Sequence, residues 1–188
     1  MPSMPFASAT PSPLGPPTHS AVIVRVPEAE PVVGHHRRQH DESAPWGVPA
    51  HVTVLFPFMA PDDLDDTVHA KLSRAVSTVP EFTATFGSTG WFADRVLWLA
   101  PDPDAPFRAL TSSVAAAFPE HPPYDGAHDD VVPHLTVGQD AAVETLRAVE
   151  RQVQSTLPVQ KRVTEVEVIV GRPEVGGSWA VVGRFPLA

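Results

Sequence analysis

Two short stretches of the sequence each place a histidine and a threonine two residues apart. Residues 51–54 read His-Val-Thr-Val, and residues 134–137 read His-Leu-Thr-Val. Because residues i and i+2 of a β-strand point to the same face, each stretch presents an imidazole beside a hydroxyl and turns its apolar residues toward a core. Two histidines can supply a general base and a general acid to one reaction. Threonine hydroxyls can donate hydrogen bonds to phosphoryl oxygens, so these four side chains are the first candidates for chemistry.

Both stretches lie in segments whose pattern predicts a β-strand followed by a helix. The first strand covers residues 50–56 and stops at Pro57, and the second ends at Gly138. The order strand, helix, strand, strand holds from residue 50 to 100 and again from 132 to 185. This repeated order predicts two related lobes that face each other, so that the two histidines meet in one cleft.

Hydrophobic spacing and turn residues predict the remaining elements. Helices are expected over residues 28–41, 61–79, 107–118 and 143–153. Further strands are expected over residues 20–26, 81–86, 95–100, 159–170 and 178–185. The strands at 81–86 and 95–100 are predicted to pair antiparallel, with an extension of the pair through Trp91 and Phe92.

The composition is acidic and limits the class of partner. The 188 residues include 13 Lys and Arg against 22 Asp and Glu, which gives a formal net charge of −9. Tight binding to long nucleic acid normally needs a basic face, so a long duplex is not expected as a partner. If the substrate carries phosphate, we expect a small nucleotide or one end of an RNA.

Other features of the composition bear on location and domain organisation. The chain has no cysteine, which excludes disulfides, thiolate–zinc sites and cysteine nucleophiles. No apolar run approaches the roughly 18 residues of a membrane span, and the N-terminus has neither a basic leader nor an apolar block. We therefore expect a cytoplasmic protein that is not bound to membranes, and a monomer. Residues 1–19, rich in proline, are expected to form a disordered tail, which leaves residues 20–188 as one domain.

The residues around the two stretches resemble the paired signatures of a known family. Residues 49–58 (Pro-Ala-His-Val-Thr-Val-Leu-Phe-Pro-Phe) and residues 132–138 (Val-Pro-His-Leu-Thr-Val-Gly) look like the two motifs of the 2H phosphoesterase superfamily. Within it, the chain most resembles the 2′-5′ RNA ligase-like proteins and cyclic nucleotide phosphodiesterases. The resemblance covers roughly residues 20–187 and leaves out the proline-rich tail.

The resemblance implies both a fold and an activity. It implies a bilobal α+β fold, in which two pseudo-symmetric lobes of antiparallel sheet with flanking helices surround a central groove. It also implies metal-independent chemistry on 2′,3′-cyclic phosphates or 2′-5′ phosphodiester bonds, without a cofactor. Carried over to this sequence, His51 and His134 are the catalytic pair, and Thr53 and Thr136 hold the phosphate.

Hydrolysis of a ribose 2′,3′-cyclic phosphate illustrates what the pair of histidines can do. The attacking water must lose a proton, and the departing ribose oxygen must gain one. An imidazole with an ordinary pKa near ~6.5 can do either task, so one ring must be neutral and the other protonated. This requirement predicts a bell-shaped pH–rate curve. In-line attack places the two histidines on opposite walls of the groove, but the sequence does not assign the base and the acid, and the roles exchange if the reaction runs toward ligation.

Two other functions are compatible with the sequence. The chain could be a non-catalytic nucleotide-binding module on the same fold. Alternatively, it could be a metal-dependent hydrolase that uses His35, His36 and His40, since residues 36 and 40 are neighbours on one helix face. Aromatic candidates for stacking a base are Trp46, Phe56, Phe58, Trp91 and Tyr124. Arginine candidates for steering a phosphate are Arg37, Arg38, Arg95 and Arg172, for which a solvated surface role is the default expectation.

Overall fold

The computed structural model describes residues 6–8, 12–127, 131–139 and 141–188. The helices are α1 (Glu30–His40), α2 (Asp66–Val76), α3 (Ala105–Ala117) and α4 (Val143–Gln154), with short 3-10 turns η1 (Pro27–Ala29), η2 (Pro61–Asp63) and η3 (Pro123–Gly126). The strands are β1 (His19–Arg25), β2 (His51–Leu55), β3 (Phe82–Phe92), β4 (Val96–Asp102), β5 (Leu135–Gly138), β6 (Val159–Val163), β7 (Glu165–Gly171) and β8 (Ala180–Pro186).

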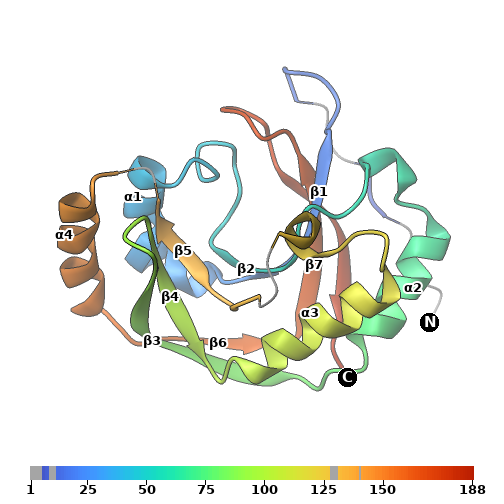
Figure 1. The fold of residues 1–188 in the computed structure, drawn as a ribbon. Coiled ribbons are helices and arrows are strands. Elements are labelled where there is room, and N and C mark those ends of the chain that lie inside the picture. Colours follow the sequence, from blue (N-terminus) through green and yellow to red (C-terminus); the bar gives the residue numbers. More distant parts are fainter. Residues whose placement is uncertain (1–5, 9–11, 128–130, 140) are drawn as a thin grey trace.

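These strands form two antiparallel sheets of four strands each. One sheet has the order β2-β1-β7-β8, and the other has the order β5-β4-β3-β6. The strands that carry the two motifs, β2 and β5, are therefore edge strands of different sheets. These two edges contact each other, and both strands lie at the centre of the molecule (Figure 1). The predicted α+β fold with two sheets is confirmed.

The sheets are not built from contiguous halves of the chain. The hairpin β3–β4 follows β2 in the sequence but pairs with β5, and the hairpin β7–β8 follows β5 but joins the sheet of β2 through β1. The first stretch has the predicted order β2, α2, β3, β4, but in the second stretch β5 and α4 are followed by three strands, β6, β7 and β8, where two were predicted. Each sheet takes strands from both stretches. Alternation of apolar residues specifies which face of a strand is buried, but it does not specify the neighbouring strand.

Two element predictions can be compared with the strands directly. The strand predicted at 159–170 is divided at Thr164, because β6 pairs with β3 in one sheet while β7 pairs with β1 and β8 in the other. The predicted antiparallel pair at 81–86 and 95–100 is confirmed, and its extension reaches Phe92, which pairs with Val96.

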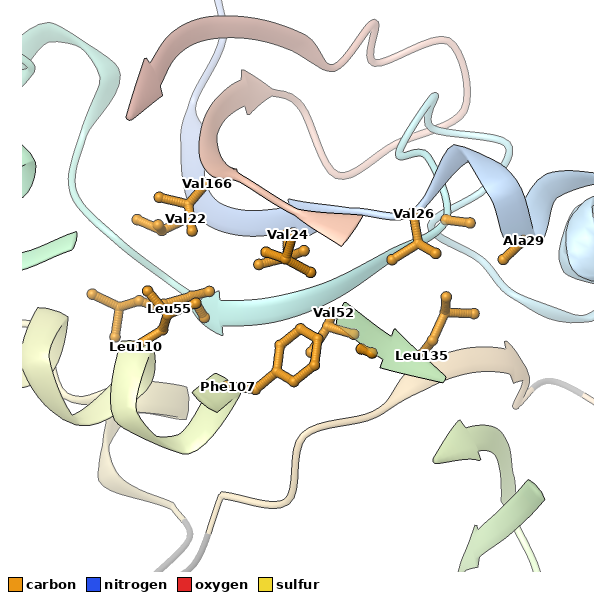
Figure 2. Packing of buried hydrophobic residues seen from close by; sticks show 14 of the residues in the cluster. Val22, Val24, Val26, Ala29, Val52, Leu55, Phe107, Leu110, Leu135 and Val166 are labelled. Carbon is orange, nitrogen blue, oxygen red and sulfur yellow. The ribbon is translucent and has the colours of Figure 1, made fainter. Parts of the chain in front are cut away.

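Pairs of helices cover one face of each sheet. Helices α2 and α3 pack against the sheet of β2, and α1 and α4 pack against the sheet of β5. Figure 2 shows Phe107 and Leu110 of α3 beside Val52 and Leu55 of β2. These side chains are at most 1% exposed, so α3 holds the first motif strand by close apolar packing.

Local signals fix where the helices begin and end. The Asp65 side chain accepts a hydrogen bond from the backbone N–H of Val68 and caps the N-terminus of α2. Basic residues occupy the last turn of α1, where they suit the negative end of the helix dipole. In the described part of the chain, no helix is long and apolar enough to cross a membrane.

Part of the predicted tail lies against the sheet of β2. The Phe6 ring contacts the rings of His69 and Phe185, and the backbone N–H of Ala7 donates to the carbonyl of Val182. Strand β1 already begins at His19. Residues 1–5 and 9–11 lie outside the described residues. That this segment has no catalytic role stays a prediction.

Candidate active site

The two motif stretches have the same pattern of burial. His51 is the first residue of β2, and His134 directly precedes β5. The alternating apolar residues are at most 1% exposed, namely Val52, Val54, Leu135 and Val137. The histidines and threonines between them are half-buried and point away from that core. The alternation predicted from the sequence is confirmed in both strands.

Each motif histidine is oriented by a carbonyl two residues before it. The Nδ1 atom of His51 lies 2.7 Å from the carbonyl oxygen of Pro49, and the Nδ1 atom of His134 lies 2.8 Å from that of Val132. Because a carbonyl oxygen only accepts hydrogen bonds, Nδ1 must carry the proton in both rings. A neutral ring in this tautomer has its lone pair on Nε2, which is the atom available to take or give a proton.

Burial lowers the pKa of both imidazoles. At His51, burial is the largest cause and the nearby Arg37 guanidinium is the next; together they lower the pKa to about 4, against opposing effects of the Pro49 carbonyl and the Asp41 carboxylate. Burial also lowers the pKa of His134 below 6.5, although the Val132 carbonyl partly offsets it. The ordinary pKa assumed from the sequence therefore does not hold, because it depends on surroundings that only the fold creates.

The two rings lie within electrostatic reach of each other. A positive charge on His134 is among the causes that lower the pKa of His51. This effect agrees with the contact between β2 and β5. A proton on His134 therefore makes His51 less able to hold one, which favours a state with one ring neutral and the other protonated.

Tyr124 reaches the first motif from the turn η3. Its phenol is hydrogen-bonded to the Thr53 side chain, and burial raises the pKa of the phenol. Its backbone N–H donates to the carbonyl of Phe56 at 2.7 Å, just beyond the end of β2. Tyr124 has a φ angle of +52°, a backbone conformation that residues other than glycine rarely adopt. The sequence suggested Tyr124 only as a stacking residue, since a loop gives no signal of where its side chain points.

Aromatic side chains surround the second motif. The Phe92 ring meets the His134 ring edge-on at 4.8 Å, and the Trp98 ring lies 6.1 Å from it. Trp98 pairs with Thr136 on one side and with Gly90 on the other. A Cβ atom at Gly90 would come within 2.4 Å of the Trp98 indole, so only glycine lets this indole lie flat across β3. No pattern in the sequence singled out Trp98.

Arg37 is buried, contrary to the expectation of a solvated surface role. Its side chain is 3% exposed and forms an ion pair with Asp41, with 3.0 Å between Nε and Oδ2. Its Nη2 atom also donates to the Ser43 hydroxyl and to the carbonyl of Val48. The helical pattern of α1 alone does not reveal this burial, because residues 41–48 close over the end of the helix.

The other arginine and aromatic candidates lie elsewhere. Arg172 is paired with Glu174, and Arg38 and Arg95 are exposed. Phe58 is a core residue against Phe118, and Trp91 donates its Nε1–H to Glu150. Trp46 and Phe56 pack against a second, smaller apolar cluster formed by Ala21, Ile23, Val48 and Ile169.

The histidines of α1 do not gather into a metal site. Burial and the neighbouring His35 and His40 lower the pKa of His36. Among the residues that the structure describes, no three His, Cys, Asp or Glu side chains are arranged to hold a metal ion. The metal-dependent alternative therefore lacks a ligand set in this part of the chain.

Comparisons with known proteins agree with this arrangement. The family model of the 2′-5′ RNA ligase superfamily matches residues 25–173. The structure of Escherichia coli LigT complexed with 3′-AMP is similar, with a TM-score of 0.59 and 18% identity over 92% of this chain and 99% of LigT. The structure of a protein of Thermus thermophilus is also similar, with a TM-score of 0.57 and 18% identity over 89% of this chain and 97% of the Thermus thermophilus chain.

At these identities the solved structures show the shared fold alone. A structure of Escherichia coli LigT complexed with ATP is also similar, with a TM-score of 0.50 and 18% identity over 92% of this chain and 98% of LigT. No curated protein matches the chain. The family model covers most of the sequence and includes both His-x-Thr motifs. The chain belongs to the 2′-5′ RNA ligase superfamily, a group of 2H phosphoesterases.

Proposed function

We propose that this protein is a metal-independent phosphoesterase that hydrolyses 2′,3′-cyclic phosphate ends or 2′-5′ phosphodiester bonds of RNA or small nucleotides. The observation that carries the proposal is the matched pair of imidazoles on two strands in contact. Each ring has its Nδ1–H fixed by a carbonyl of its own chain segment, which leaves Nε2 of both rings available. The nucleotides bound to LigT, 3′-AMP and ATP, agree with a nucleotide substrate.

The unequal pKa values favour one assignment of roles for hydrolysis. His51 has its pKa lowered to about 4 and is neutral at higher pH, so it is the ring that is in the form required of the base. It accepts a proton from water at Nε2 as the water oxygen bonds to phosphorus. His134 donates its Nε2 proton to the ribose oxygen whose bond to phosphorus breaks. The extra proton on His51 and the missing proton on His134 then exchange with solvent.

The threonines serve the phosphoryl oxygens in this proposal. Thr53 and Thr136 lie two residues after the histidines on the same strand faces, so their hydroxyls can donate to the non-bridging oxygens. The hydrogen bond between the Tyr124 phenol and the Thr53 side chain restricts the rotamer of Thr53 before substrate arrives. A hydroxyl that is already oriented loses less conformational entropy when the phosphate binds.

The proposal is tested with a panel of substrates. The four ribonucleoside 2′,3′-cyclic phosphates and a 2′-5′-linked dinucleotide are incubated with the purified protein, and the products are identified as 2′- or 3′-phosphates. Turnover of at least one substrate is expected. Binding of these nucleotides without any turnover would instead support the non-catalytic binding module.

The pH dependence of kcat/KM is expected to be bell-shaped with a maximum below neutral pH. Activity falls below about pH 4, where His51 becomes protonated and can no longer act as the base. Activity also falls as pH rises through the pKa of His134, which burial lowers below 6.5, because the acid then loses its proton. Initial rates measured from pH 3.5 to 9 test this, and a maximum on the alkaline side of neutrality would contradict the assigned roles.

Removal of metal ions is expected to leave the activity unchanged. The proposed chemistry uses only imidazole and hydroxyl groups of the chain. Rates are compared before and after exhaustive dialysis against EDTA, with zinc, magnesium or manganese added back. A loss of activity that one of these ions restores would favour the metal-dependent hydrolase.

A further inference from the structure

Two arginines make the same contact ahead of the two motif histidines. The Arg37 Nη2 atom donates to the carbonyl of Val48 at 3.2 Å, and Val48 lies three residues before His51. The Arg108 Nη1 atom donates to the carbonyl of Val131 at 3.2 Å, and Val131 lies three residues before His134. The peptide that each arginine holds leads directly into the residue whose carbonyl orients the histidine ring.

Each of these arginines is itself held by an aspartate four residues away, at the cap of its helix. In α1, Arg37 pairs with Asp41, with 3.0 Å between Nε and Oδ2. Around the start of α3, Arg108 pairs with Asp104, with 2.7 Å between the corresponding atoms. An ion pair with hydrogen-bond geometry restricts the guanidinium, so that its remaining N–H groups point in a fixed direction.

The two helices connect the motif strands crosswise. Helix α1 packs against β5, while its Arg37 holds the segment that enters β2. Helix α3 packs against β2, while its Arg108 holds the segment that enters β5. Each helix thus packs against one motif strand, and its arginine holds the segment that leads into the other motif strand by a hydrogen bond. This arrangement fixes the two histidines relative to each other, and not only each within its own strand.

Further hydrogen bonds strengthen the connection on the side of α1. The Gln139 side chain, just past β5, donates to the Asp41 carboxylate at 3.4 Å, and its backbone N–H donates to the carbonyl of His40. The Glu30 carboxylate accepts from the backbone N–H of Ala50 at 2.7 Å. The end of the second motif strand and the start of the first are therefore attached to the same helix.

We propose that Arg37 and Arg108 are positioning residues, each of which sets the orientation and tautomer of one catalytic histidine. This inference rests on the proposed function for its catalytic part, but the orientation of the rings is independent of any substrate. Neither arginine needs to touch the substrate in this role. Their common effect is to keep Nε2 of both rings directed at one place.

The two arginines differ in their surroundings. The Arg37 and Asp41 side chains are 3% and 1% exposed, whereas those of Arg108 and Asp104 are 37% and 48% exposed. Water therefore screens the charge of Arg108, but it does not screen that of Arg37. The groups that act on His51 are Arg37, Asp41, His134 and the Pro49 carbonyl; Glu30 lies beside Arg37, and Arg25 is the neighbour of His51 on β1.

The test combines kinetics with nitrogen-15 NMR of the histidine rings, which reports the tautomer of each imidazole. In the wild-type protein, His51 and His134 are expected in the Nδ1–H tautomer. Arg37→Met is expected to introduce the Nε2–H tautomer at His51 and leave His134 unchanged, and Arg108→Met is expected to do the reverse. Each variant is expected to lower kcat for a 2′,3′-cyclic nucleotide by about 10- to 100-fold with a smaller change in KM.

Controls separate positioning from general loss of structure. Arg162 lies on β6 and forms an exposed ion pair with Glu81, and Arg162→Met is expected to change neither the spectra nor kcat. If Arg37→Met does not fold because Asp41 is left unpaired, the variant Arg37→Met with Asp41→Asn removes that charge and takes its place. Unchanged tautomers in both arginine variants, or equal changes at both histidines in each, would overturn the inference. If the wild-type protein shows no turnover but the two arginine variants show the expected tautomer changes, only the proposed function is overturned.

Discussion

His51→Ala and His134→Ala are each expected to lower kcat for 2′,3′-cyclic nucleotides by about 10²- to 10⁴-fold. Each substitution removes one of the two proton transfers that the displacement at phosphorus needs. The double variant is expected to be little slower than either single variant, because the two rings act as one unit and their effects do not add. Steady-state kinetics at the pH optimum measures this, and circular dichroism confirms that the variants are folded.

His35→Ala is the matched control for this pair of substitutions. His35 is an exposed histidine on α1 and lies beside the half-buried His36. Its removal is expected to change kcat by less than about twofold, since surface substitutions away from the site have small effects. Wild-type rates in His51→Ala, or a large loss in His35→Ala, would show that the motif histidines are not the catalytic pair.

Thr53→Val and Thr136→Val are each expected to lower kcat by about 10²- to 10³-fold, as the loss of one preorganised donor does in other enzymes. Valine keeps the shape of threonine and suits a strand, so the fold is expected to survive. The loss is expected in kcat more than in KM, because the hydroxyl donates most strongly when negative charge develops on the phosphoryl oxygens.

Thr83→Val is the control for the threonine substitutions. Thr83 is exposed on β3, where it pairs with Arg162. This variant removes an exposed strand hydroxyl that lies on neither motif strand and is expected to keep the wild-type rate. Full activity in both Thr53→Val and Thr136→Val would contradict the role of these residues in holding the phosphate.

The sequence predicts those parts of the site that depend on local order. The alternation in residues 51–54 and 134–137 correctly assigns the inward and outward faces of β2 and β5. The predicted fold with two antiparallel sheets is confirmed, although the second stretch has three strands after its helix where two were predicted. A period of two is a property of the strand itself, so it can be read from any strand with one buried face.

The sequence does not predict features that arise from contacts between distant segments. Which hairpin joins which sheet depends on pairing partners, and the exchange of β3–β4 and β7–β8 leaves no mark on the alternation. The sequence indicates a surface position for Arg37, but residues 41–48 fold over the end of α1 and bury it. The pattern within the helix does not reveal this contact. The low pKa of His51 follows from the burial of its own ring and from the charge of Arg37.

One signal in the sequence did point toward the arginines. Arg37 and Asp41, and likewise Asp104 and Arg108, are spaced four residues apart, which is the spacing of an ion pair on one helix face. Each pair belongs to the helix that comes before a motif strand. Taken together, these two regularities single out the arginines, although neither does so alone.

In the proposed reaction, the two imidazoles act on the same phosphorus atom from opposite sides. A crystal structure of the protein with a nucleoside 2′,3′-cyclic vanadate, which mimics the in-line arrangement of attacking and leaving oxygens, tests this most directly. We predict Nε2 of His51 and Nε2 of His134 at about 2.6–3.2 Å from the two apical oxygens of the vanadate. A vanadate that contacts only one of the two rings, or that binds elsewhere on the protein, would contradict the shared role of the two histidines.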